Sequence, residues 1–85
     1  MNTNEIQKRI REFIVETFLF GEDAETLADD ESFLESGLID STGILELIQF
    51  LEESFEIEIA DEEMIPENLD AIERATRFVG RKRAA

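Results

Sequence analysis

Three segments of the sequence carry apolar residues at intervals of three and four, and this spacing constrains the fold most. It favours amphipathic helices, because residues spaced in this way share one face of a helix. The predicted helices run from about Asn4 to Phe20, from Ser41 or Thr42 to about Phe55, and from a cap at Asn68 to an end near Gly80. Their apolar positions are Ile6, Ile10, Phe13, Ile14, Thr17 and Phe18; Ile44, Leu47, Ile48, Leu51 and Phe55, widened by Leu45 and Phe50; and Leu69, Ile72, Thr76, Phe78 and Val79.

The sequence also predicts the connections between these helices. Thr3 or Asn4 can cap the first helix and Gly21 can end it. A long loop follows, from Gly21 to about Asp40, and apolar residues predict that it is structured and pinned to the core. These residues are Leu27, Phe33, Leu34, Leu38 and Ile39. Gly37 suits a turn that needs a positive φ.

A short turn of helix is expected after Ile57 and Ile59, capped by Asp61 and ended by Pro66. The predicted fold class is therefore all-α: a small bundle of three main helices and one short helix, with a long structured loop between the first and second helices. At 85 residues the chain is expected to form one domain over residues 1–85 with a single small core.

The sequence contains no Cys and no His. Disulfides, cysteine nucleophiles, the usual zinc ligands and the commonest general base are therefore excluded. Any thiol chemistry has to come from a cofactor or a partner. A serine hydrolase using Ser41 is disfavoured for the same reason, because no evident base accompanies the serine.

Charge is distributed very unevenly along the chain. From Glu12 to Glu73 there are 21 acidic residues and no basic residue, while all eight basic residues lie nearer the two ends. This disfavours nucleic-acid binding, which needs Lys or Arg to contact phosphates. It favours a partner with a basic surface. The alternative is that the acidity only keeps a small protein soluble.

No apolar run approaches the roughly 20 residues that span a bilayer, so neither membrane insertion nor a secretory leader is expected. The expected form is a cytoplasmic monomer. The acidic runs Asp29–Glu31 and Asp61–Glu63 lack the alternating ligand spacing of an EF-hand loop. We therefore expect no specific metal site.

The segment from Gly37 to Ile44 joins the long loop to the most apolar helix, and Ser41 lies where that helix begins. Unpaired backbone N–H groups and the positive end of the helix dipole would stabilise a phosphate attached there. A serine at a helix start is ordinarily only a cap. Gly43 in the first turn has two interpretations: close approach of another group, or a tolerated glycine.

The stretch from Phe33 to Phe55, FLESGLIDSTGILELIQFLEESF, resembles the attachment site and second helix of acyl carrier proteins. The Asp40-Ser41 pair, Glu46-Leu47 and Leu51 to Glu53 match the family's pattern, and the resemblance continues through Ile59, Asp61, Glu62 and Glu63 to Asn68 and Val79. It implies that a phosphopantetheinyl transferase attaches 4'-phosphopantetheine from coenzyme A to Ser41, and that Asp40 helps this enzyme dock. The thiol of the arm then carries acyl groups as thioesters for fatty acid, polyketide or related biosynthesis.

Thr42 and Gly43 depart from the commonest family pattern, which has Leu directly after the Ser. Asp-Ser-x-Gly is similar to D-alanyl carrier proteins and to carriers charged by separate ligases, so the expected partners include an acyl- or aminoacyl-adenylating ligase. Partner enzymes are expected to dock on an acidic track, with apolar contacts near the arm. The track comprises Glu46, Glu52, Glu53, Asp61, Glu62 and Glu63, and the apolar contacts Ile44 and Leu45.

The expected function is thus a carrier protein without catalytic activity of its own. The competing hypothesis is an unmodified acidic interaction module, such as a nucleic-acid mimic or an inhibitor of a basic partner. A mimic would need the acidic surface, but it has no use for an exposed Ser before a Gly on an apolar helix.

Overall fold

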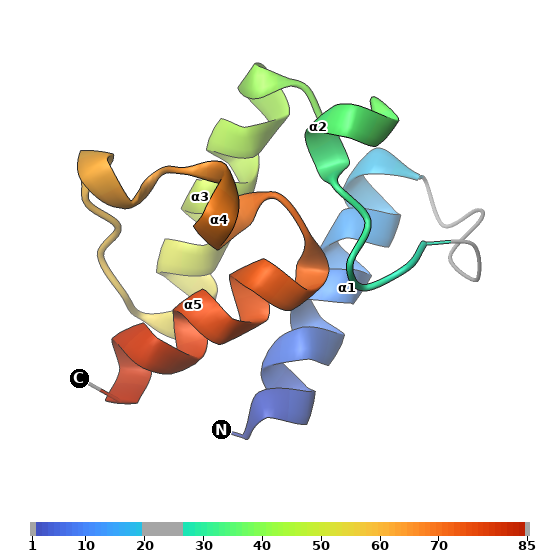
Figure 1. Cartoon of the computed structure of the whole chain (residues 1–85). Helices are drawn as coiled ribbons and strands as arrows, with labels where there is room; N and C mark the ends of the chain where they lie inside the picture. The colour runs from blue at the N-terminus through green and yellow to red at the C-terminus, as the bar shows by residue number, and fades with distance from the viewer. Residues whose placement is uncertain (1, 20–26, 85) are drawn as a thin grey trace.

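The structure, a computed structural model, describes residues 2–19 and 27–84, and in these ranges it is helical without strands (Figure 1). Its elements are α1 (Thr3–Phe18), α2 (Phe33–Ser36), α3 (Ser41–Phe55), the 3₁₀ turn η2 (Asp61–Glu63), α4 (Pro66–Leu69) and α5 (Ile72–Ala84). The predicted all-α fold is confirmed. None of these helices is long and apolar enough to cross a membrane.

The core lies between α1, α3 and α5, the three long helices (Figure 1). Their inward faces supply the fully buried side chains Ile10, Ile14, Leu47, Leu51, Phe55, Ile72 and Val79. Each had been expected from the helical spacing. Phe13 and Phe50 are only half-buried, and their rings stack between α1 and α3 with centroids 4.1 Å apart.

The segment before α3 is pinned to this core, as the sequence predicts. Leu27, Phe33 and Ile39 are buried, and Leu38 is half-buried. The prediction was wrong for Leu34, which is 44% exposed. Gly37 ends α2 with φ at 78°, the left-handed conformation for which a glycine was expected.

A polar clamp that the sequence did not reveal holds α2 in place. Asp70 is only 5% exposed and lies after α4, yet its carboxylate accepts hydrogen bonds from the Ser32 hydroxyl and from the Leu34 N–H. The Phe33 N–H donates to the backbone carbonyl of the same Asp70 at 3.1 Å. A helix of four residues has no stability of its own, so these tertiary contacts position it.

Arg11 of α1 anchors the part of the long loop that includes Leu27 and Asp29. Its guanidinium donates to the Leu27 carbonyl at 2.9 Å and pairs with the Asp29 carboxylate. This hydrogen bond from Arg11 holds the pKa of Asp29 below its usual value. The Asp29 carbonyl in turn accepts from the Glu73 N–H of α5 at 2.9 Å, so the loop joins both helices.

The helix ends partly differ from the sequence-based prediction. The cap of α1 is Asn2 rather than the expected Thr3 or Asn4, and its side chain accepts the Glu5 N–H at 2.9 Å. The helix ends at Phe18 rather than Phe20, and the expected terminator Gly21 lies outside the described residues. The bounds of α3 agree with the prediction, and Glu56 ends it in the left-handed conformation with φ at 54°.

The segment between α3 and α5 was predicted least well. Ala60, not Asp61, precedes η2, and Pro66 begins α4 instead of ending a helix. Proline suits the first helical position because its missing N–H would be unpaired there. Asn68 lies inside α4 rather than capping the last helix, and α5 continues through Gly80 to Ala84.

Candidate functional site

Ser41 is the first residue of α3 and is exposed. The cap of this helix is its neighbour Asp40, whose carboxylate oxygen Oδ1 accepts the Gly43 N–H at 2.8 Å. Ser41 is therefore not the cap, which is the ordinary role of a serine at a helix start. Within residues 2–19 and 27–84 its hydroxyl has no hydrogen-bond partner.

Gly43 follows in the first turn of α3 and is buried. A Cβ at this position would lie 2.6 Å from the Cγ2 of Ile39 and 2.9 Å from the Cε1 of Phe18. Of the two interpretations of this glycine, close approach is the one that the structure supports. The approaching groups are the protein's own side chains, which pack the end of α1 and the loop against the start of α3.

Apolar residues lie beside Ser41. Leu45, one turn further along α3, is 62% exposed, and Ile44 is half-buried. The exposure of Leu45 contradicts its expected place in the buried stripe and agrees with its expected role as a surface contact. Ile44 also lines a small cavity of about 80 Å³ between α2, α3 and the η2–α4 segment. The other apolar residues of this lining are Leu34, Met64, Ile65, Pro66 and Leu69.

Four of the six carboxylates in the expected acidic track are exposed: Glu46, Glu53, Asp61 and Glu62. Glu46 lies five residues past Ser41, which places it roughly 7–8 Å further along the helix axis. Glu53 accepts a hydrogen bond from Gln49 at 3.2 Å on the same exposed face. Their exposure leaves these four carboxylates accessible to a partner.

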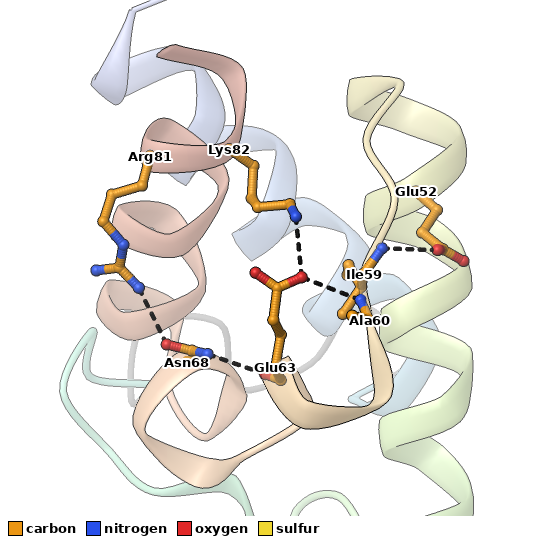
Figure 2. Close-up of polar contacts among 7 residues, drawn as sticks. All are labelled: Glu52, Ile59, Ala60, Glu63, Asn68, Arg81 and Lys82. Carbon is orange, nitrogen blue, oxygen red and sulfur yellow. Dashed lines mark hydrogen bonds and ion pairs between the residues drawn. The ribbon is translucent and has the colours of Figure 1, made fainter. Parts of the chain in front are cut away.

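The remaining two carboxylates, Glu52 and Glu63, are half-buried and accept hydrogen bonds within the protein. This corrects their expected placement on the free face. Glu52 is half-buried and accepts the Ile59 N–H at 3.0 Å, because the chain after α3 turns back beside this helix (Figure 2). Glu63 accepts the Ala60 N–H at 3.0 Å and pairs with Lys82 at 2.9 Å. These contacts, first the hydrogen bond from Ala60 and then that from Lys82, lower the pKa of Glu63.

The described part of the chain contains no cluster of three or more acidic side chains arranged to hold a metal ion. The geometry at Ser41 suits a different group, a covalently attached phosphate ester. An exposed hydroxyl without a partner is accessible to a modifying enzyme. The backbone N–H groups of the first turn of α3 and the dipole of this 15-residue helix would stabilise the attached phosphate.

Comparison with known proteins gives consistent matches. Residues 8–74 match the family model described as "Phosphopantetheine attachment site". An acyl carrier protein from Buchnera aphidicola subsp. Schizaphis graminum is 32% identical over 79 residues, which cover 93% of this chain and 95% of the relative. One from Buchnera aphidicola subsp. Acyrthosiphon pisum is 35% identical over 77 residues, 91% of each.

A solved structure shares the fold. The solution structure of a holo acyl carrier protein from Nitrosomonas europaea matches with a TM-score of 0.77, at 22% identity, over 93% of this chain and 96% of that one. These findings do not favour the alternative of an unmodified acidic module. The chain belongs to the acyl carrier protein family, whose acyl cargo is carried on a 4'-phosphopantetheine prosthetic group.

Proposed function

We propose that Ser41 is the residue to which the phosphopantetheine arm is attached. The observation that carries this proposal is that Asp40, and not Ser41, caps α3. Asp40 caps the helix, which leaves the neighbouring Ser41 hydroxyl exposed and without a hydrogen-bond partner among the described residues. Ser36 differs, because its hydroxyl donates to the Phe33 carbonyl at 3.2 Å, and Ser32 donates to Asp70.

Attachment needs only one reactive atom from this chain. The Ser41 oxygen attacks the β-phosphorus of coenzyme A, a P–O bond of the pyrophosphate breaks, and the adenosine bisphosphate half leaves. The hydroxyl proton passes to a base of the phosphopantetheinyl transferase, since this chain has no His. The attached arm supplies the thiol that a sequence without Cys lacks.

The protein acts as a carrier without catalytic activity of its own. Its partners are the transferase and the enzymes that load, modify or remove the acyl group. The expected adenylating ligase stays a prediction from the Asp-Ser-x-Gly pattern. Gly43 has a packing role against Ile39 and Phe18 that any cargo would leave unchanged, so it is weak support for one cargo.

The direct test is modification of the purified chain by a broad-specificity transferase with coenzyme A. Intact mass should increase by one phosphopantetheine in the parent and in Thr42→Ala, and should not change in Ser41→Ala. Circular dichroism establishes that the Ser41→Ala chain is folded. A folded Ser41→Ala chain that still gains the arm would refute the assignment.

The docking surface has its own test. Charge reversal at the exposed residues Glu46 and Glu53 should slow arm transfer and flatten its dependence on salt, because exposed charges mainly set the association rate. The matched control reverses Glu5 and Glu12, which are exposed on α1. If both double variants are modified at the parent's rate at low salt, the acidic face serves solubility and not docking.

A further inference from the structure

The five basic residues of α5 differ in the parts of the protein that they contact. Among the described residues, Arg77 pairs only within its own helix, through a 3.9 Å ion pair with Glu73. Three of the other four reach the segment that connects α3 to α5, and Arg83 reaches the last residue of α3. Their contacts are Arg74 to the Pro66 carbonyl at 3.2 Å, Arg81 to the Asn68 Oδ1 at 3.0 Å, Lys82 to the Glu63 carboxylate at 2.9 Å and Arg83 to the Phe55 carbonyl at 2.7 Å.

The first three of these contacts fall on η2 and α4, and those of Arg81 and Lys82 are coupled (Figure 2). Glu63 binds Lys82 through its carboxylate and accepts the Asn68 amide through its backbone carbonyl at 2.9 Å. The same Asn68 accepts from Arg81. One connected set of hydrogen bonds therefore runs from α5 across the segment from Glu63 to Asn68.

Apart from these bonds, the segment has few apolar contacts, of which the partly buried Met64 packs against the core. No residue from Asp61 to Asn68 is buried, and Ile65 is 41% exposed; Leu69 is its first buried residue. Neither η2 nor the four-residue α4 is long enough to be stable alone. Segments with few buried apolar contacts open at low free-energy cost, so the polar contacts decide how firmly this one is held.

The segment is also one wall of the cavity beside α3. Met64, Ile65, Pro66 and Leu69 line it on one side, and Leu34 and Ile44 on the other. The cavity is partly open to solvent, and its volume of about 80 Å³ is the space of two or three water molecules, so a larger apolar group would fit between these walls only if one of them moved.

We propose that Arg74, Arg81 and Lys82 form a clasp that fixes the η2–α4 segment, one wall of this cavity, to α5, and that releasing the clasp allows this wall to move and the cavity to open. The clasp is a conformational device built from the C-terminal bases. Its consequence for acyl cargo rests on Ser41 being the attachment residue, because Ile44 in the cavity lining is one turn from Ser41. The opening itself does not depend on that assignment.

The test compares local and global opening in the unmodified chain. Arg81→Met with Lys82→Met removes two clasp cations and keeps the aliphatic stems. The control, Lys8→Met with Arg77→Met, removes the same charge from exposed positions. Hydrogen exchange is followed at the amides of Asn68, Leu69 and Asp70, which bond to the Ile65 and Pro66 carbonyls.

Exchange at these three amides should be about tenfold faster in the clasp variant than in the control, since each partly exposed charge-assisted bond contributes a factor of several. Amides in the middle of α1 and α3 should exchange alike in both variants. Lys82→Arg, which keeps the charge, should behave like the parent. As a second readout, methyl relaxation dispersion at Ile44 and Ile65 should increase only in the clasp variant.

Two results would overturn the clasp. One is unchanged exchange at the three amides together with unchanged dispersion. The other is a uniform acceleration throughout α1, α3 and α4, which would show that the bases contribute only to global stability. Neither result bears on Ser41, because the chain is tested without the arm.

Discussion

Gly43→Ala isolates the packing at the start of α3. The new methyl would lie 2.6 Å from the Ile39 Cγ2 and 2.9 Å from the Phe18 Cε1. The Phe18 contact is with the far end of a half-buried ring, which can move. Ile39 is 1% exposed and its methyl lies close to the backbone, so this contact can be relieved only by shifting the loop.

The expected change in the free energy of unfolding is the sum of two opposing contributions. Overpacking a core costs about 1–3 kcal/mol. Replacing Gly by Ala in a helix gains about 0.5–1 kcal/mol. The net expectation is a loss of about 1 kcal/mol, which for a domain of this size lowers the melting temperature by roughly 4–8 °C.

Gly80→Ala is the matched control. Gly80 lies within α5, and a Cβ there would meet nothing within 4 Å. This variant should gain only the higher helix propensity of Ala, and it should melt a few degrees higher than the parent. Thermal unfolding followed by circular dichroism measures both. If Gly43→Ala is stabilised as much as Gly80→Ala, the close approach at Gly43 is not a constraint, and the reasoning is refuted.

Two further predictions concern buried and paired carboxylates. Asp70→Ala leaves the Leu34 N–H and the Ser32 hydroxyl without their acceptor, so urea unfolding should show a loss of about 1–3 kcal/mol, against almost none for the exposed Asp61→Ala; equal losses would contradict the clamp. Glu63 has a lowered pKa in the folded state, so its contribution to stability is present above the usual glutamate pKa and is lost as the pH falls through the folded value. Glu63→Gln should therefore melt below the parent at about pH 7, and this gap should narrow as the pH falls below the usual glutamate pKa; a gap that does not change with pH would show that ionised Glu63 adds nothing.

The sequence predicts the long helices well because their apolar spacing is a local signal. It predicted α3 with its observed ends, and it placed Ile10, Leu47 and Val79 in the core. It missed α2 because four residues are too short to show a period. The clamp that holds α2 joins Ser32 to Asp70, a pairing that no local pattern reveals.

The functional site was predicted only in part, because no local pattern in the sequence shows which side chains form its hydrogen bonds. Asp40 and Ser41 are both good caps, and only the hydrogen bond from the Gly43 N–H shows that Asp40 has this role. Glu52 and Glu63 resemble the exposed carboxylates in sequence, but the chain after α3 turns back and uses both as acceptors. Pro66 was interpreted as a stop, although a proline equally suits the first turn of a helix.

The central claim is that Ser41 carries the arm, and mapping of the modified residue tests it most directly. The parent chain is treated with coenzyme A and transferase, digested, and sequenced by tandem mass spectrometry. We predict that the added mass lies on Ser41, with Ser36, Thr42 and Ser54 unmodified. Addition of the arm at any of those three hydroxyls, with Ser41 unmodified, would contradict it.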